Sequence, residues 1–230
     1  FALVPARRLP VRHDPGRRAL VTDAAARAAA PVLLAARDLR SPFGGPFTFD
    51  VRAGECIAIQ GPSGAGKSVL LRMLADLDPH DGDALLDGCC AASMPAPAWR
   101  AAVVYQAAEP AWWEPTAGAH FTAADHDIVD AMLAPLALPA RLLDTEIDRL
   151  STGERQRLAL VRSLARRPRV LLLDEPTAAL DPDAVARVEA LLRDCLARGM
   201  AMLVVTHADG QARRLAHRIF RLEQGQLVTP

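Results

Sequence analysis

The sequence has 230 residues and a formal net charge of zero, with 27 acidic side chains balancing 27 basic ones. This length suits one α/β domain or two small ones, and the balanced charge excludes a global field that would draw the protein onto nucleic acid. The four cysteines have neither zinc-site spacing nor the density of a disulfide scaffold, which predicts reduced thiols. No apolar run approaches the roughly 18 residues that a bilayer-spanning helix needs.

Residues 1–30 predict a flexible leader that precedes a folded domain over residues 31–230. Arginines interrupt every apolar run among the alanines and prolines of this stretch, so it lacks the layout of a signal peptide. A solvated tail is favoured. An arm that touches phospholipid or nucleic acid is the alternative.

Two stretches, residues 32–39 and 47–51, have the pattern of strands, with a turn rich in proline and glycine between them. We expect an antiparallel pair in which Phe47, Phe49 and Val51 share a buried face. Phe43 lies in the turn, where its ring could either stack beneath a nucleotide base or pack within the turn itself.

Residues 61–68 read GPSGAGKS and fit the phosphate-binding loop pattern G-x-x-x-x-G-K-[ST] at every fixed position. A short apolar strand over 56–60 precedes the loop and a helix over 69–77 follows, so a helix N-terminus would face the anion. Lys67 is the one lysine of the sequence, and a compact ammonium suits the space between backbone N–H groups. We expect a nucleoside triphosphate on Gly61, Pro62, Ser63, Gly64, Ala65, Gly66, Lys67, Ser68 and Val69, with the Ser68 hydroxyl on Mg²⁺.

Strands over 83–87 and 102–106 follow, and residues 110–150 then predict a small helical insertion broken by prolines. Trp112 and Trp113 open it, and two adjacent side chains cannot face the same side of a regular element. One tryptophan is therefore expected to be exposed for a partner, with burial on two sides as the alternative. The nearby His120, Asp125, His126 and Asp127 are interpreted as surface residues in preference to a metal site.

The second half alternates strand and helix. Residues 169–174 form an apolar run that ends in Asp174, which predicts a buried parallel strand with its carboxylate at the carboxyl edge. A helix over 183–198 follows, capped by Asp181, and then a strand over 200–205 before His207. Asp174 is expected to bind Mg²⁺ and Glu175 to act as the general base on the attacking water.

Several ordered stretches resemble the ATP-binding cassette ATPases over about residues 32–228. They are the phosphate loop, the signature-like LSTGE of 150–154, DEPT of 174–177, ALD of 179–181 and His207. The resemblance implies an α/β fold: a P-loop NTPase core of mainly parallel sheet, with an antiparallel β subdomain and the helical insertion. Within the family, the small single-domain bacterial ATPases of iron export and metal resistance are the most similar type.

The resemblance also implies site roles. Glu175, His207 and Lys67 would be catalytic, and ATP would lie between two subunits arranged head to tail. The signature residues Ser151, Thr152, Gly153 and Glu154, together with Asp181, would then contact the nucleotide held by the partner. The second glycine and the glutamine usual in this signature are replaced by Thr152 and Glu154.

The glutamine that the family places near Mg²⁺ has two candidate positions. Gap-free alignment puts it at Ala108, whereas Gln106 lies two residues earlier on the same face of an extended strand. We expect Gln106 to contact nucleotide and metal, which requires a shifted strand end.

The function implied is that of an ATP-hydrolysing subunit, cytoplasmic and peripheral at the inner face of the cell membrane, that drives a separate permease without a nucleic-acid partner. The alternative is a soluble cassette ATPase acting on nucleic acid or ribosomes. A GTPase is disfavoured because the guanine-reading motif Asn-Lys-x-Asp requires a second lysine.

Overall fold

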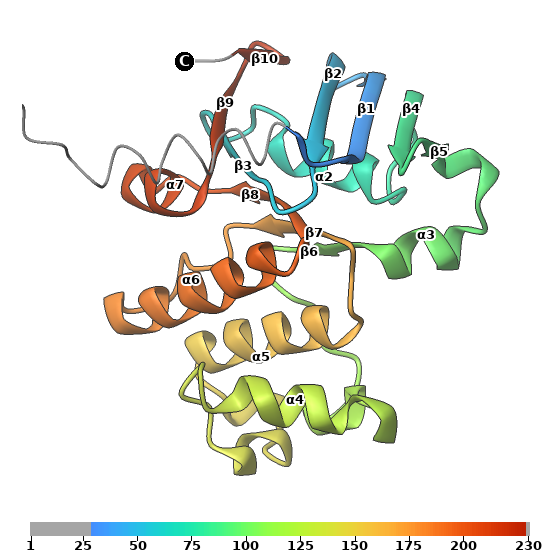
Figure 1. Ribbon diagram of the computed structural model, residues 1–230. Coiled ribbons are helices and arrows are strands. Elements are labelled where there is room, and N and C mark those ends of the chain that lie inside the picture. The colour runs from blue at the N-terminus through green and yellow to red at the C-terminus, as the bar shows by residue number, and fades with distance from the viewer. Residues whose placement is uncertain (1–28, 229–230) are drawn as a thin grey trace, which may run out of the picture.

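The computed structural model describes residues 29–228, so the predicted leader lies outside the described residues except for its last two positions. A six-stranded sheet crosses the middle of the molecule in the order β10-β9-β3-β8-β7-β6 (Figure 1). Neighbouring strands are parallel except for the antiparallel pair β9 and β10, which confirms a mainly parallel core. Its strands are β3 Cys56–Gln60, β6 Val103–Gln106, β7 Val170–Asp174, β8 Ala201–Val205, β9 Arg218–Glu223 and β10 Gln226–Val228.

A second, antiparallel sheet has the order β2-β1-β4-β5. It contains β1 Val32–Ser41, β2 Gly44–Arg52, β4 Asp81–Leu86 and β5 Cys89–Cys90. The predicted pairing of the first two strands is confirmed, and Phe47, Phe49 and Val51 are buried as expected.

The helices are α2 Lys67–Leu74, α3 Ala96–Ala102, α4 His126–Leu133, α5 Thr152–Ala165, α6 Pro182–Ala197 and α7 Asp209–Leu215. The predicted bounds of the first helix, 69–77, were wrong at both ends. Gly66 has the left-handed φ of 96° and serves as the N-cap, so the helix begins at Lys67. Asp76 also has a positive φ, 55°, which ends the helix before the exposed Leu77.

Between residues 110 and 150 the structure places α4 and four short 3-10 helices: η2 Gly118–His120, η3 Ala123–Asp125, η4 Ala140–Leu143 and η5 Ile147–Arg149. Another 3-10 helix, η1 Ala91–Ser93, precedes α3. Helix α4 packs against α5 below the main sheet (Figure 1). No helix among residues 29–228 combines the length and apolar character needed to cross a bilayer.

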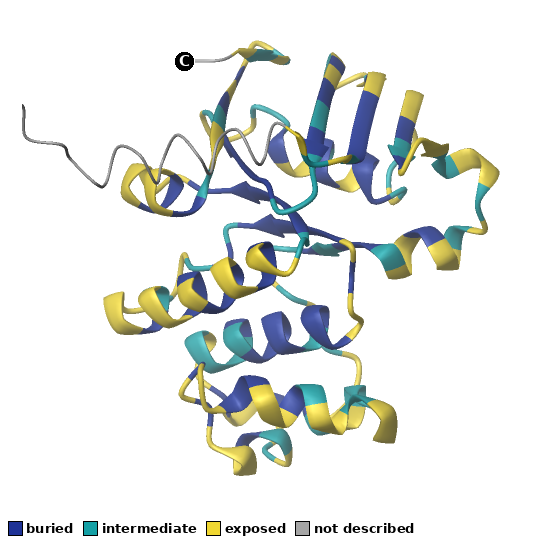
Figure 2. Ribbon diagram, viewed as in Figure 1, coloured by how far each residue is buried: buried dark blue, intermediate teal, exposed yellow. Residues whose placement is uncertain are grey.

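The core has two parts because successive strand residues point to opposite faces. Leu171 and Leu173 of β7 join the cluster that contacts α4, α5 and α6, whereas Val170 and Leu172 join the cluster that contacts α2 and the antiparallel sheet. Figure 2 shows the resulting continuous burial along the central strands. The sheet is thus fixed from both sides, which holds its carboxyl edge as a rigid platform.

Candidate active site

The predicted phosphate loop connects β3 to α2. Its helix N-terminus has no side-chain cap and no acidic residue in the first turn. The first N–H groups of a helix have no partner within the helix, and the helix dipole makes this end favourable for negative charge. Loop and helix therefore offer an anion site of the predicted kind.

Lys67 lies within the loop, only 6% exposed. Its Nζ donates hydrogen bonds to the carbonyl oxygens of Gly61 at 2.9 Å and Pro62 at 2.8 Å. An ammonium has three donors, so one remains for an oxygen of a bound anion.

The loop is packed against two other elements. A Cβ added to Gly61 would lie 2.5 Å from the carbonyl oxygen of Leu222 in β9, and one added to Gly66 would lie 3.2 Å from that of Phe43. The backbone of the turn that carries Phe43 therefore touches the loop, and Phe43 is 70% exposed. This is the setting expected of an aromatic ring available to a base.

The carboxyl ends of the parallel strands bring the predicted acidic residue to the same edge. Asp174 is paired in register with Val205, which is also paired with Ile59 just before the loop. The Asp174 carboxylate is buried and accepts a hydrogen bond of 3.1 Å from the Tyr105 hydroxyl. Burial and the charge of Asp174 both raise the pKa of Tyr105, which keeps that hydroxyl a donor.

Gln106 ends β6 opposite Leu173. Its side chain is buried, yet neither its amide nitrogen nor its amide oxygen has a hydrogen-bond partner among the described residues. A buried amide without partners is costly, so this side chain fits a site completed by a polar group from outside the chain. Ala108 is exposed two residues later.

Glu175 and His207 meet at this edge. Oε1 of Glu175 lies 3.1 Å from Nε2 of His207, and both side chains are accessible to solvent. Glu175 has a positive φ of 46°, and its amide donates a 3.0 Å hydrogen bond to the carbonyl of Val205. Such backbone geometry is sparsely populated in residues other than glycine, and it turns the carboxylate towards the histidine.

A cavity of about 260 Å³ joins the start of the loop to His207. It is lined by Gln60, Gly61, Pro62, Thr206, His207, Asp209, Arg221 and Glu223. Of the predicted site residues, the structure therefore brings the loop and His207 together directly, with Glu175 in contact through His207.

The signature-like residues do not line this cavity. Ser151 is the N-cap of α5, and it forms a reciprocal capping box with Glu154. Gly153 packs against the Ala179–Asp181 segment, since a Cβ there would lie 3.3 Å from Cδ2 of Leu180. Asp181 caps α6 as predicted by accepting from the Ala184 amide at 2.9 Å, and this hydrogen bond lowers the pKa of Asp181.

Sequence reasoning missed several residues that support the site. Tyr105 contacts Asp174, and two buried glutamines, Gln156 and Gln211, bond to the segment that follows Asp174. The burial of Gln156 could have been predicted, because this residue shares one face of α5 with the buried Ala159, Leu160 and Ser163 at helical spacing.

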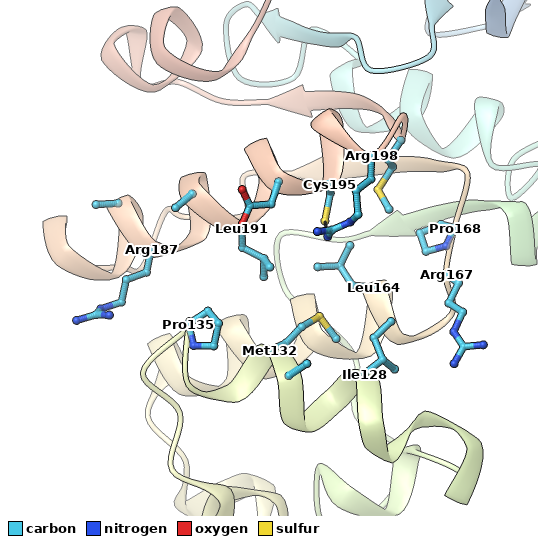
Figure 3. Close-up of a pocket in the computed structure, with 15 residues that line it drawn as sticks. Ile128, Met132, Pro135, Leu164, Arg167, Pro168, Arg187, Leu191, Cys195 and Arg198 are labelled. Atoms are coloured by element: carbon cyan, nitrogen blue, oxygen red, sulfur yellow. Dashed lines mark hydrogen bonds between the residues drawn. The ribbon is translucent and has the colours of Figure 1, made fainter.

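A larger cavity of about 870 Å³ lies away from these residues, between α4, α5 and α6 (Figure 3). Its floor is apolar and includes Met132, Leu164 and Leu191, while Arg167, Arg187 and Arg198 are among its lining residues. None of the predicted site residues lines this cavity.

Comparison with known proteins gives concordant results. Residues 45–178 match a family model described as ABC transporter. The chain is 36% identical over 212 residues to the aliphatic sulfonates import ATP-binding protein SsuB 1 of Nocardia farcinica, covering 86% of this chain and 81% of that protein. It is 35% identical over 196 residues to the Nod factor export ATP-binding protein I of Paraburkholderia xenovorans, covering 79% of this chain and 63% of that protein.

The fold comparison agrees. A solved structure of an ATP-binding subunit of an ABC transporter superposes with a TM-score of 0.75 at 25% identity, covering 86% of this chain and 90% of that one. The described fold therefore has close structural counterparts along almost its whole length.

Proposed function

The chain belongs to the ABC transporter family, and we propose that residues 31–230 form its ATP-hydrolysing domain, with a helical insertion at about 110–150. The domain would bind Mg-ATP, dimerise head to tail across two nucleotides and drive a separate membrane permease. Because the two relatives described above are named for import and for export, the proposal concerns the ATPase and sets no direction of transport.

The contact between Glu175 and His207 is the observation that carries the proposal. A carboxylate one residue beyond the buried Asp174 and within 3.1 Å of the His207 imidazole, which lines a cavity shared with the loop, would accept a proton from an attacking water. His207 would hold that carboxylate in position and reach the terminal phosphate. Lys67 would neutralise the charge of the phosphates within the loop.

The residues present fit a metal-bound nucleotide. Ser68 and Asp174 supply oxygen ligands of the kind Mg²⁺ prefers, and the unpartnered amide of Gln106 offers a further oxygen. When bound, Mg²⁺ would neutralise phosphate charge and orient the terminal phosphate. Phe43 would stack on the base.

The dimer would complete the site from the partner's side. Ser151 and the N-terminus of α5, now capped by Glu154, would form a second anion-binding end of a helix, separate from the one in the phosphate loop. Ser151, Thr152, Gly153, Glu154 and Asp181 of one subunit would therefore contact the nucleotide held by the other.

The permease would dock beside Trp113. That side chain is 70% exposed, and it borders a cavity of about 320 Å³ that also contains Leu77, Phe121, Arg100 and Arg166. The guanidinium carbon of Arg162 lies 4.3 Å from the ring centroid of Trp112 and 4.7 Å from that of Trp113. Burial lowers the pKa of Arg162. An exposed aromatic side chain beside a cavity lined by both apolar and charged residues is typical of an interface anchor.

Two donors beside this cavity have no acceptor within the described residues: Nε1 of Trp112 and Nη1 of Arg162. Both atoms are buried, so a carbonyl or carboxylate oxygen of a partner segment would reach them only if the tryptophan side chains moved aside on docking. We therefore propose that a short permease helix binds here and that the protein is peripheral at the inner face of the cell membrane through this contact.

The proposal is tested with a Glu175→Gln variant and a surface control, Glu146→Gln. We expect Glu175→Gln to lower the rate of Mg-ATP hydrolysis by about 100-fold or more, because general-base catalysis contributes about that much. The same variant should accumulate as an ATP-dependent dimer in light scattering. Wild-type protein without ATPase activity, or a Glu175→Gln variant with the wild-type rate, would refute the proposal.

The partner is tested by co-purification. Tagged Glu175→Gln protein is incubated with membranes and Mg-ATP, and the proteins retained are identified by mass spectrometry. A multi-spanning protein that is lost when Trp113 is replaced supports the permease; ribosomal or nucleic-acid-bound proteins alone would overturn it.

A further inference from the structure

The segment Glu175–Ala179 is held from both sides by buried glutamines. Gln156 comes from α5, five residues after Ser151, and Gln211 comes from α7, four residues after His207. Both side chains are almost fully buried, 4% and 2% exposed. A buried primary amide persists only where its groups are hydrogen-bonded, so the partners of these two side chains indicate what they hold.

Gln156 bonds to the backbone at both ends of the segment. Its Nε2 donates to the carbonyl of Glu175 at 2.9 Å, and its Oε1 accepts from the amide of Ala179 at 3.4 Å. The Glu175 amide is bonded to Val205 on the other side. The backbone of Glu175, which has the unfavourable positive φ, is thus fixed by one bond to β8 and one to α5.

Gln211 bonds to the side chains of two threonines. Its Nε2 donates to Oγ1 of Thr177 at 2.8 Å, while its Oε1 accepts from Oγ1 of Thr206 at 2.8 Å. Thr206 Oγ1 in turn accepts from the Ala208 amide at 3.1 Å, so both neighbours of His207 are tied to this network.

From these contacts we infer that Gln156 and Gln211 form a clamp that positions the Glu175 and His207 side chains. The inference rests on the proposed ATPase function. Gln156 links the position of the signature helix α5 to the catalytic carboxylate, and Gln211 links Thr177 to the His207 loop. Both are positioning residues, since the hydrogen bonds of the two glutamines go to the Glu175 and Ala179 backbone and to Thr177 and Thr206.

Gln156 would therefore connect the dimer interface at Ser151 to the Glu175 backbone in the same subunit. A shift of α5 when Ser151 engages the partner's nucleotide would pull directly on the Glu175 carbonyl. Catalysis is sensitive to displacements of about 1 Å, so this bond would make the water-activating group responsive to dimer closure.

The first test is Gln156→Leu, which keeps a side chain of similar size and removes both hydrogen bonds. We expect kcat for Mg-ATP to fall about 10- to 100-fold while the Kd of a fluorescent ATP analogue stays within about two-fold. Ser163→Ala is the matched control, because Ser163 is buried on the same face of α5 and should leave kcat unchanged. Wild-type kcat in a folded Gln156→Leu protein would overturn the inference.

A second measurement does not depend on activity. Amide hydrogen exchange of residues 175–181 should accelerate at least about ten-fold in Gln156→Leu, because the Ala179 amide loses its acceptor, and should stay unchanged in Ser163→Ala. Gln211→Leu should accelerate exchange of residues 206–208 instead. Unchanged exchange in both variants would refute the clamp, whereas a wild-type protein without ATPase activity would refute only the proposed function.

Discussion

The Ser151 hydroxyl donates its hydrogen to Oε2 of Glu154 at 2.7 Å, and the Ser151 amide donates to the same oxygen at 2.9 Å. In return, the Glu154 amide donates to the Ser151 hydroxyl at 3.3 Å. A hydroxyl has one hydrogen to donate, so in this conformation Ser151 has none left for a phosphate of a partner subunit. Glu154 therefore stabilises the start of α5, and it would compete with the proposed partner nucleotide for Ser151.

The negative charge of Glu154 predicts the effect of Glu154→Gln. A glutamine preserves the capping box, because its amide oxygen still accepts, but it removes a negative charge beside a polyphosphate. One such charge at about 4 Å in water is worth about 1 kcal/mol, so the ATP concentration for half-maximal dimerisation should fall about five-fold. This ATP concentration is measured by light scattering on protein that also carries Glu175→Gln. A higher ATP requirement would show that Glu154 assists dimerisation.

Acid should destabilise the fold through its helix caps. Hydrogen bonds from Ser151 and from the Ala184 amide lower the pKa of Glu154 and Asp181 in the folded state. The unfolded chain then binds more protons as pH falls, so these contributions are present above the unfolded pKa of about 4 and are lost as pH falls through the lowered pKa of the folded state. Thermal unfolding at pH 7 and pH 3.5 should show a smaller loss for Asp181→Asn than for wild type. Asp148→Asn serves as the control.

The single lysine makes nucleotide binding measurable by chemical modification. Because Lys67 lies in the loop, an amine-reactive reagent should modify it about 100-fold more slowly when ATP is present at 100 times its Kd. Mass spectrometry of the peptide that carries Lys67 gives the rate, with the N-terminal amine as an internal reference. Equal rates with and without Mg-ATP would mean that nucleotide does not occupy the loop.

Trp113→Ala should separate docking from catalysis. The side chain is mostly exposed and its main contact is the stacked Arg162, so its removal should lower the free energy of unfolding by only about 0.5–1 kcal/mol and leave basal ATP hydrolysis unchanged. Co-purification with the permease should be lost, since interface anchors typically contribute about 2 kcal/mol or more. Val228→Ala, another exposed apolar residue, is the control and should retain the permease.

Much of the sheet could be predicted from local sequence. The strands over 56–60, 170–174 and 201–205 are apolar runs of the length that a buried parallel strand needs, and each was placed to within one residue. Strands β9 and β10 were not predicted, because charged residues interrupt the apolar positions of β9 and β10 has only three residues. The order of strands also escaped prediction, since pairing depends on contacts distant in sequence.

The motif residues of the candidate site could likewise be located from their fixed spacing, and their chemical roles stay predictions. The supporting residues could not be located in this way. Tyr105 donates to Asp174 across 69 positions, and Gln211 bonds to Thr177 across 34. Whether a buried glutamine bonds to backbone, threonine or ligand is decided by which elements surround it, and no local pattern contains that information.

The packing of the phosphate loop against Leu222 and the Phe43 turn also has a calorimetric consequence. A loop whose backbone is already fixed by neighbouring strands has little conformational entropy to lose when an anion arrives. The bound nucleotide would also cover little apolar surface of the protein beyond one aromatic ring. Nucleotide binding to the monomer should therefore have a small negative heat-capacity change, whereas formation of the dimer, which buries far more surface, should have a large one.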